Sequence, residues 1–312
     1  IVARLYAVLH VRVSPLSVLL LGESNEVKEI EQYFTGKSTE VIRIAALNES
    51  DLKQRIQNKP IAYIIFDEKE KAVLTAFHIL MPLLQADVKM MTTSTAYESI
   101  FKKIPINEIS SAWFIEYIHL KKTPFDSIKR VIDIVASLVL FVILSPIFII
   151  CAILVLALTG RPIIYKQERV GKNGRKFMLR KFRSMIRNAE SAGPQLSGGE
   201  DIRVTRLGKF LRASHLDEMP QLLNIFLGEM SFVGPRPERQ NYVDTLSKDI
   251  PYFEIRHSIK PGLTGWAQIR HGYASDHDAF FEKFQYDLYY IKNRSLVFDM
   301  LVLLKTARKL IP

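Results

Sequence analysis

The feature that most constrains this chain is a run of 26 residues, Ile134 to Thr159, without a charged side chain. A straight α-helix of that length would be roughly 39 Å long, enough to cross the hydrocarbon core of a bilayer. The dipeptide Ser145-Pro146 lies in its middle. Because proline removes a helical hydrogen bond and clashes with the preceding turn, we expect a bend there, with the Ser145 hydroxyl satisfying freed carbonyls.

Both flanks of this run are basic. It is preceded by Lys121, Lys122, Lys129 and Arg130, and followed by Arg161, Lys166, Arg169, Lys172, Arg175 and Lys176. The positive-inside rule retains both flanks on the cytoplasmic side. A re-entrant membrane helix over residues 131–160, which enters and leaves by the same face, satisfies the bend and the flanks together. A proline-kinked spanning helix is the alternative.

The two parts of the chain differ in charge. Residues 1–120 hold 13 Lys and Arg against 14 Asp and Glu, whereas residues 121–312 hold 30 against 18. The second part should therefore bind polyanions: nucleic acid, anionic lipid head groups or phosphorylated small molecules. A single cysteine, Cys151, excludes a disulfide framework and a zinc-finger cluster. We find no signal peptide, and because the chain starts at Ile1 we expect that residues precede it in the full protein.

The first part alternates short apolar segments with polar, helix-compatible stretches. The apolar segments at 17–21, 41–45, 61–66 and 87–91 predict buried strands, and the alternation predicts a Rossmann-like α/β domain over residues 1–110. The dinucleotide fingerprint is missing, because Gly22 is followed by Glu23 and Glu26, which would repel a pyrophosphate. We therefore expect a scaffolding or regulatory domain, joined by a linker over residues 111–130.

The second part contains several local signals. Two alternating segments flank Lys172-Asn173-Gly174, and Asn-Gly is the favoured type I′ turn pair, so a β-hairpin is predicted. Residues 188–202 have a loop composition, and 203–227 a helical pattern interrupted at Pro220. The segment 260–270 reads as a glycine-containing loop. The tail has apolar residues at helical spacing, which suits an interfacial amphipathic helix and a core-packed helix equally.

The adjacent carboxylates Asp217 and Glu218 are the candidate catalytic residues. Four hypotheses compete: a helix-start device, a Mg²⁺ site shared with substrate phosphates, general acid–base chemistry, and an aspartate that attacks phosphorus. Nearby cations would hold a phosphorylated substrate and keep an aspartate ionised; these are Lys181, Arg183, Arg203, Arg206 and Arg236. Arg236 is singled out because Pro235 and Pro237 fix its backbone. Phosphoryl chemistry on a lipid-associated substrate is favoured.

Five stretches, in order, closely resemble the bacterial sugar transferases, the monotopic phosphoglycosyl transferases. They are KRVIDIVASLVLFVILSPIF, YKQERVGKNGRKFMLRKFRSM, TRLGKFLRASHLDEMPQLLNIFLGEMSFVGPRPE, KPGLTGWAQI and DLYYIKNRSLVFDMLVLLKT. The resemblance covers roughly residues 121 to 312. The upstream part resembles the Rossmann-like extension of the larger members, which usually carry further membrane helices before it.

The resemblance implies a reaction. Members move a sugar-1-phosphate from a UDP-sugar to a polyprenyl (undecaprenyl) phosphate, release UMP, and initiate exopolysaccharide, capsule or O-antigen synthesis. It implies that Asp217 is the nucleophile, that Glu218 assists in proton transfer or orients the acceptor, and that Mg²⁺ bridges Asp217 and the diphosphate. Ser145-Pro146 matches the motif that breaks the family's re-entrant helix. Phosphate and substrate contacts are expected from Lys181, Arg183, Arg206, Gln221 and Arg236.

The expected architecture is therefore α/β: a Rossmann-like domain, then a monotopic, mainly α, membrane-associated catalytic domain with a re-entrant helix and a small β-hairpin. The catalytic part covers residues 161–312 and ends in an amphipathic helix. We expect it at the cytoplasmic face of the bacterial cytoplasmic membrane, in contact with membrane lipids and without nucleic acid. A homodimer is left open, as is the donor, for which UDP-glucose and UDP-galactose are candidates.

Two other functions are alternatives to this reaction. A glycosyltransferase that releases UDP would offer a metal-binding Asp-x-Asp near a strand end. Only Asp276, His277 and Asp278 could mimic such a cluster, and a polar loop is the favoured interpretation of that segment. A membrane-tethered binding module without catalysis would need a recognition helix or interleaved aromatic residues, and the sequence shows neither.

Overall fold

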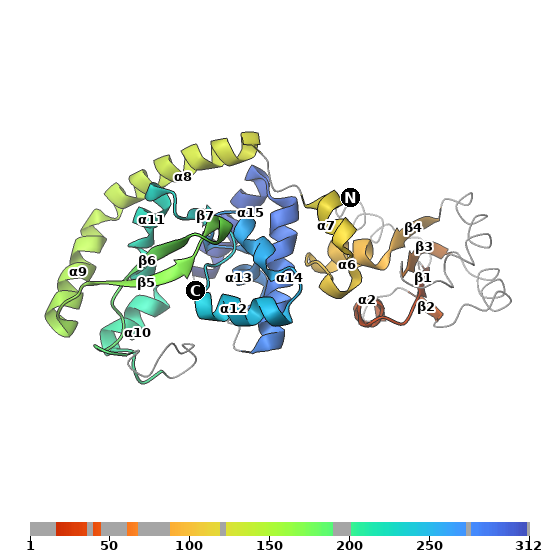
Figure 1. The fold of residues 1–312 in the computed structure, drawn as a ribbon, viewed down its shortest axis with the longest axis horizontal. Helices are drawn as coiled ribbons and strands as arrows, with labels where there is room; N and C mark the ends of the chain where they lie inside the picture. The colour runs from red at the N-terminus through yellow and green to blue at the C-terminus, as the bar shows by residue number, and fades with distance from the viewer. Residues whose placement is uncertain are drawn as a thin grey trace. The chain divides into compact units, whose positions relative to one another are not determined.

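The computed structural model describes residues 17–35, 40–44, 61–67, 88–118, 123–189, 201–272 and 276–310. The chain forms two compact units, Ile1–Phe114 and Ile115–Pro312 (Figure 1). Each unit is described by itself below.

The first unit contains a parallel sheet. Its strands are β1 (Ser17–Leu21), β2 (Glu40–Ile44), β3 (Ile61–Phe66) and β4 (Lys89–Thr92), in the spatial order β2-β1-β3-β4. Helices α2 (Asn25–Thr35) and α6 (Thr93–Phe101) pack on it. The core between them is apolar and comprises Val18, Leu20, Val27, Ile30, Phe34, Tyr63, Ile65, Ala96 and Tyr97. The predicted mixed α/β class is confirmed, and each predicted strand lies within two residues of an observed one.

The segment predicted as a linker contains regular structure. A short 3₁₀ turn, η1 (Ile106–Glu108), precedes α7 (Ser111–Tyr117), and α8 (Thr123–Ile143) begins eight residues before the expected start of the membrane helix. Pro124 lies in the first turn of α8. Proline is favoured there because its fixed φ suits the helix and its missing N–H would have no helical partner.

The apolar run folds as two helices. The second helix, α9 (Ser145–Thr159), is bent by 64° from α8. Pro146 has no N–H for the Val142 carbonyl, and the Ser145 hydroxyl donates to that carbonyl instead, at 2.8 Å. The predicted bend at Ser145-Pro146 is confirmed. No single described helix is long and apolar enough to cross a bilayer, whereas this bent pair passes the same test jointly.

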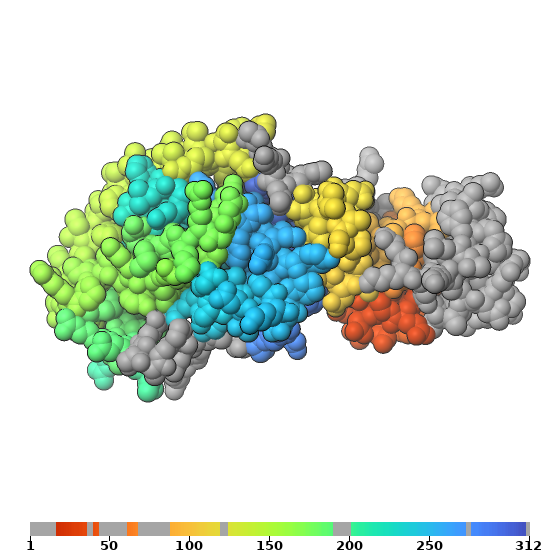
Figure 2. Space-filling model, viewed as in Figure 1, coloured from red at the N-terminus to blue at the C-terminus, as the bar shows by residue number. Residues whose placement is uncertain are grey.

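Much of the apolar surface of α8 and α9 is exposed. The exposed side chains include Val131, Val135, Leu138, Val142, Ile143, Ile149, Ile150, Ile153 and Leu158. On one side, Cys151 and Val155 of α9 pack against Phe182 and Leu211. The yellow-to-green atoms of both helices form an edge of the second unit in Figure 2. Contiguous exposed apolar surface of this kind marks an interaction site in a soluble protein or a membrane contact.

The predicted hairpin is present. Strands β5 (Ile164–Val170) and β6 (Lys176–Phe182) pair antiparallel. Asn173 and Gly174 both have positive φ, 56° and 73°, and the Arg175 N–H donates to the Lys172 carbonyl at 3.2 Å within the short 3₁₀ turn η2 (Lys172–Gly174). Positive φ at both central residues is what a type I′ turn requires, so that prediction is confirmed.

The rest of the second unit is mainly helical. Its helices are α10 (Arg206–Ala213), α11 (Gln221–Leu227), α12 (Gln240–Asp249), α13 (Trp266–Arg270), α14 (His277–Asn293) and α15 (Leu296–Leu310), with 3₁₀ turns η3 (Leu216–Glu218) and η4 (Phe253–Ser258). A core of Phe177, Leu179, Leu222, Ile225 and Met230 joins the hairpin to α11. The loop predicted around residues 188–202 lies largely outside the described residues.

The segment 260–270 is not the predicted loop. It forms β8 (Gly262–Thr264), which pairs parallel with β7 (Ser231–Val233), and then α13. Glycine permits this pairing, because a Cβ on Gly262 would lie 2.1 Å from the Gly234 nitrogen. Strands this short, made of residues that also suit turns, leave no alternating pattern in the sequence.

The C-terminal helix packs in the core on one side, and its interfacial role stays a prediction. On α15, Val302 is fully buried and packs toward the unit, whereas Val297, Met300 and Leu304 are 81%, 58% and 65% exposed. The exposed positions are three and four residues apart, so they share one face of the helix. The helix is therefore anchored in the core and presents a second apolar face.

Gly208 offers a test of packing around α10. A Cβ on this residue would lie 1.9 Å from the Ser184 carbonyl oxygen. Alanine normally stabilises a helix by about 1 kcal/mol relative to glycine. Here we expect Gly208→Ala to destabilise the protein by about 1–3 kcal/mol, because backbone must move. Thermal unfolding in detergent measures this. Gly272→Ala, where a Cβ meets nothing within 4 Å, is the control, and an unchanged midpoint in Gly208→Ala would contradict the prediction.

Candidate active site

The carboxylates Asp217 and Glu218 lie in the 3₁₀ turn η3, between α10 and α11. The Thr205 hydroxyl caps the start of α10 by accepting from the Gly208 N–H at 2.9 Å. After α10 ends, His215 adopts a left-handed conformation with φ 57°. Non-glycine residues rarely adopt it, and such outliers concentrate at functional sites. This conformation turns the chain into η3, where Asp217 is 95% buried, with a relative exposure of 5%.

Two cations converge on Glu218. Lys181 Nζ and Arg236 Nη2 lie 2.7 and 2.8 Å from the same oxygen, Oε1. Burial by itself raises the pKa of Glu218, but the charges of Arg236 and Lys181 outweigh burial and hold the pKa well below its usual range. The same pairing raises the pKa of Arg236 above its usual value. Glu218 is therefore an ionised clamp that holds two cations, and a poor proton acceptor.

The surroundings of Asp217 differ from those of Glu218. Within the described residues, its carboxylate makes no hydrogen bond or ion pair. Burial raises its pKa, while Lys181 lowers it and Glu218 raises it further. Lys181, Arg212 and Arg236 lower the pKa of Asp217, but desolvation is the larger effect, so the net shift is upward. That the cations keep Asp217 ionised stays a prediction. A cation that binds together with the substrate would stabilise the ionised form of this buried carboxylate.

The other predicted substrate-binding residues have different surroundings and do not join the contacts of Glu218. Arg183 is buried and its guanidinium donates to the carbonyls of Arg161 and Gly160, both at 2.6 Å, at the end of α9. It caps that helix and does not contact Glu218. Arg206 is exposed at the start of α10 and makes no hydrogen bond or ion pair in the described chain. Gln221 is 98% buried, with a relative exposure of 2%, and its Nε2 has no partner among the described groups.

Arg203 also has a local role. It pairs with Asp201, with Nη2 2.6 Å from Oδ2, and this hydrogen bond lowers the pKa of Asp201 to about 2. In the described part of the chain, Asp276, His277 and Asp278 form no metal cluster. They are not the predicted polar loop either, because α14 begins at His277 and Asp276 caps it by accepting from the Ala279 N–H at 2.9 Å.

The Pro-Arg-Pro segment that carries Arg236 is held along its length. Four successive carbonyls, those of residues 235 to 238, accept hydrogen bonds from other elements. The donors, in order, are Gly262 N, Arg256 Nη2, Arg169 Nη1 and Val170 N, at 2.9, 2.9, 3.0 and 2.9 Å. Satisfied carbonyls and two prolines leave this backbone little freedom. Arg236 therefore reaches Glu218 from a preorganised support.

A buried ionic network lies beneath this segment. Arg256 Nη2 is 3.0 Å from Asp287 Oδ2, and these residues are 3% and 1% exposed. Lys283 Nζ is 2.8 Å from Glu238 Oε1, and Arg169 Nη1 is 3.6 Å from its other oxygen. Burial raises the pKa of Glu238, but Lys283 and Arg256 outweigh it and lower the pKa to about 2. Such a network is costly unless its geometry is specific.

Sequence reasoning missed these residues. Arg256 and Arg169 are separated by more than eighty positions, and nothing local marks either one. A signal did exist in α14, because Lys283 and Asp287 stand four residues apart among Phe284, Leu288 and Ile291. Charges on the apolar face of a helix are rarely buried unless they are paired, and that pattern predicts a buried ionic partner.

No group of three or more metal-ligating residues occurs in the portion of the chain that the structure describes. Magnesium rarely needs one, because it commonly binds one or two carboxylates together with substrate phosphates and water. Glu218 is occupied by cations, whereas the Asp217 carboxylate has no partner among the described residues. Asp217 is therefore the residue that would hold a Mg²⁺ ion, which would supply positive charge for substrate phosphates.

The chain belongs to a known family of enzymes. The family described as bacterial sugar transferase matches residues 125–312, which include the bent helix pair and every residue of the site.

Individual relatives are consistent with this membership. The chain is 44% identical over 184 residues to an Aeromonas hydrophila protein named UDP-N-acetylgalactosamine-undecaprenyl-phosphate N-acetylgalactosaminephosphotransferase; the match covers 59% of this chain and 44% of that protein. It is 36% identical to a Klebsiella pneumoniae UDP-glucose:undecaprenyl-phosphate glucose-1-phosphate transferase, over 58% of this chain and 39% of the relative. A Caulobacter vibrioides protein of the same name is 35% identical, over 62% and 73%. The chain thus spans less than half the length of the first two.

His257, next to Arg256, predicts a pH effect on stability. Burial, and then the charge of Arg256, lower the pKa of His257 to about 4. As the pH falls from about 6.5 to about 4, His257 binds a proton in the unfolded chain but not in the folded chain. The free energy of unfolding therefore falls by at most about 1.4 kcal/mol per pH unit. Thermal unfolding of His257→Gln should lose this acid sensitivity relative to the parent. His277→Gln, at an exposed position, should keep it; parallel pH curves for parent and His257→Gln would contradict the prediction.

Proposed function

We propose that this protein transfers a sugar-1-phosphate from a UDP-sugar to undecaprenyl (polyprenyl) phosphate and releases UMP. The observation that carries the proposal is that the two carboxylates of the acidic pair make different contacts. Asp217 has a buried carboxylate without a partner in the described part of the chain, whereas Glu218 holds Lys181 and Arg236 beside it. Membership of the bacterial sugar transferase family and the names of the relatives support this reaction. The product would initiate polysaccharide synthesis.

In the proposed reaction, an Asp217 oxygen attacks the sugar-bearing phosphorus of the donor. The bond from that phosphorus to the oxygen bridging to UMP breaks, so UMP leaves with the bridging oxygen and an aspartyl phosphosugar forms. An oxygen of the polyprenyl phosphate then attacks the same phosphorus. The aspartyl bond breaks, which restores the Asp217 carboxylate and yields the polyprenyl diphosphate sugar. A covalent intermediate lets one site serve a water-borne donor and a membrane-borne acceptor in turn.

The neighbouring residues supply charge and position. Lys181 and Arg236 would bind phosphate oxygens, and Glu218 would hold both cations in place. The low pKa of Glu218 favours this clamping over proton transfer. The unpartnered Nε2 of Gln221 is a further donor for substrate. Mg²⁺, when bound at Asp217, would neutralise charge on the donor diphosphate.

The proposal includes a monotopic placement at the cytoplasmic face of the bacterial inner membrane. We propose that α8 and α9 form the re-entrant segment, and that the exposed face of α15 lies against membrane lipids. The 64° bend, the exposed apolar side chains and the two basic flanks support it. The parallel order β2-β1-β3-β4 supports a Rossmann-like, scaffolding or regulatory first domain. A homodimer is compatible with the proposal.

The test separates UMP from UDP. The purified chain is incubated with Mg²⁺, undecaprenyl phosphate and, in turn, UDP-N-acetylgalactosamine, UDP-glucose and UDP-galactose. We expect at least one of these donors to yield UMP. Repeated turnover should require the acceptor. Release of UDP would instead show transfer of the sugar alone. Omitting the acceptor is the control, because a covalent intermediate predicts about one UMP per enzyme in that case.

A further inference from the structure

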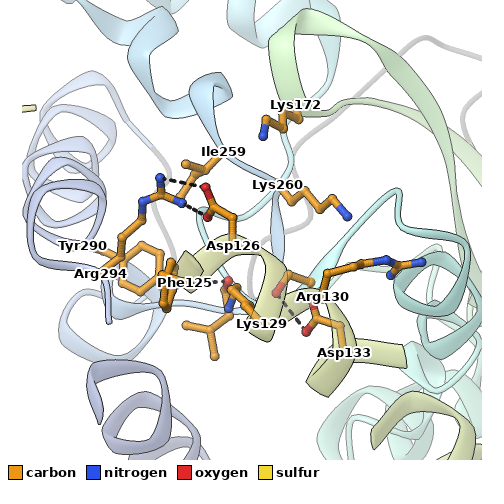
Figure 3. Close-up of a pocket in the computed structure, with 12 residues that line it drawn as sticks. Phe125, Asp126, Lys129, Arg130, Asp133, Lys172, Ile259, Lys260, Tyr290 and Arg294 are labelled. Atoms are coloured by element: carbon orange, nitrogen blue, oxygen red, sulfur yellow. Dashed lines mark hydrogen bonds and ion pairs between the residues drawn. The ribbon is translucent and has the colours of Figure 1, made fainter. Parts of the chain in front are cut away.

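A pocket lies at the start of α8, apart from the acidic pair. Its walls come from α8, the β5–β6 turn, β7, the segment after η4 and α14 (Figure 3). None of Lys181, Asp217, Glu218 or Arg236 lines it. The pocket is therefore not part of the candidate active site, although the same unit forms both.

The acidic side chains of this pocket are already engaged. Asp126 forms an ion pair with Arg294. Asp133 accepts from the Ser231 hydroxyl at 3.1 Å and from the Phe232 N–H at 3.2 Å. Lys129 is paired in turn with Asp299 of α15. Among the described residues, no carboxylate forms an ion pair with the cations that remain, although the charge of Asp133 acts on Lys260.

Three cations remain on the pocket: Arg130, Lys172 and Lys260. In Figure 3 the side chains of Arg130 and Lys260 extend in the same direction, whereas Lys172 is drawn apart from them, on the β5–β6 turn. Arg130 donates only to neutral groups, the carbonyls of Ile225 and Phe226, both at 2.7 Å. The side-chain ammonium groups of Lys172 and Lys260 make no hydrogen bond or ion pair with any group the structure describes. Burial, and then the charge of Arg130, lower the pKa of Lys260; the charge of Asp133 opposes this shift, and that of Lys172 adds to it. Arg130 and Lys172 therefore both repel Lys260, and a bound anion would relieve that repulsion.

The position of the pocket indicates which anion. Exposed apolar side chains on α8 begin at Ile128 and continue through Val131 and Ile132, so the pocket lies where the polar start of α8 passes into its apolar length. In the membrane placement proposed above, this is the level of the lipid head groups. The abundant anion there is a phosphate attached to lipid, and clustered Arg and Lys side chains suit it.

We propose that Arg130, Lys172 and Lys260 bind the phosphate of an anionic membrane phospholipid. The bound phosphate would bridge α8, the β5–β6 turn and the segment leading into β8, and so tie the hairpin to the membrane surface. This inference rests on the proposed membrane placement and does not depend on the transfer reaction.

The test is a lysine-reactivity footprint of the full chain in a non-ionic detergent. An amine-specific acylating reagent is applied below the pKa of lysine, and the rate at each lysine is read by mass spectrometry. Phosphatidylglycerol, phosphatidylcholine or inorganic phosphate is added at matched concentration. Phosphate binding that raises a lysine pKa by one unit makes the reactive neutral amine about tenfold rarer. We expect phosphatidylglycerol to slow acylation of Lys172 and Lys260 about tenfold, and to leave Lys166 and Lys176 of the same hairpin nearly unchanged.

Matched variants complete the test. Lys172→Gln should lose most of the protection at Lys260, whereas Arg175→Gln, which removes an exposed charge from the same turn, should keep it. Equal slowing at Lys166 would show diffuse attraction and overturn the site, as would no slowing at all. Equal protection by inorganic phosphate would overturn the role of the lipid. Because no donor or acceptor is added, failure of the transfer reaction leaves this result readable.

Discussion

Asp217→Asn is expected to abolish UMP release, with a fall in kcat of at least about 10⁴-fold; removal of the nucleophile of a serine protease costs about 10⁶-fold. The amide keeps the shape of the side chain and removes the attacking oxyanion. The Asp217 carboxylate is buried and has no partner among the described residues. Because burying an unpaired carboxylate is unfavourable, thermal stability should stay the same or rise. The measurement is UMP release together with the unfolding midpoint, each compared with the parent.

Glu218→Gln is the matched control for this prediction. It leaves Lys181 and Arg236 without the carboxylate that both contact, so stability should fall along with activity. The two variants should therefore lose activity while their stabilities move in different directions. A label on the donor phosphosugar should remain on the parent protein in the absence of acceptor and should not attach to Asp217→Asn. Retention by Asp217→Asn of more than about a hundredth of the activity would exclude it as the nucleophile.

Arg256→Gln is expected to lower both stability and transfer rate, although this residue lies outside the acidic pair. It breaks the buried pair with Asp287 and removes the donor to the Arg236 carbonyl at 2.9 Å. Leaving one partner of a buried pair uncompensated costs about 3–5 kcal/mol. The loosened Pro-Arg-Pro segment should place Arg236 less well, so we expect kcat to fall by about 10- to 100-fold. Unfolding in detergent and UMP release at saturating donor measure the two effects.

A second variant separates folding from positioning. In Arg256→Met/Asp287→Leu both charges are absent, and apolar replacement of a buried pair often restores stability. The Arg236 carbonyl still lacks its donor, so activity should remain low while the unfolding midpoint recovers. Arg256→Lys keeps the charge but not the two-pronged geometry, and should give intermediate activity. Recovery of both stability and full activity in the double variant would show that the pair serves folding alone.

The features that could be predicted from sequence are the local ones. The bend at Ser145-Pro146 follows from a missing amide hydrogen, and the β5–β6 turn from the tolerance of Asn173 and Gly174 for positive φ. The strands of the first unit follow from short apolar runs. Each signal lies within a few residues of the feature it produces. Local signals of the same kind were too weak for β7 and β8, which are three residues long and depend on glycines that pair with distant backbone.

The candidate site shows the same limit. The cationic neighbourhood of Asp217 and Glu218 could be read from composition, but which cation meets which carboxylate could not. The sequence predicts a phosphate contact for Arg183 as for Lys181, two positions away. In the structure, Arg183 instead caps α9. Arg256 carried no local signal, yet it holds the segment that positions Arg236.

The sequence by itself thus determined the acidic pair, the apolar run with its bend and the basic character of the second unit, because these depend on which residues are adjacent. Only the tertiary structure decided that Glu218 takes both cations and that Asp217 has no partner among the residues the structure describes. It also decided that four carbonyls beneath Arg236 are held by four separate donors. The physical reason is that hydrogen bonds and ion pairs depend on atomic distances of about 3 Å, and folding creates those distances between residues far apart in the chain.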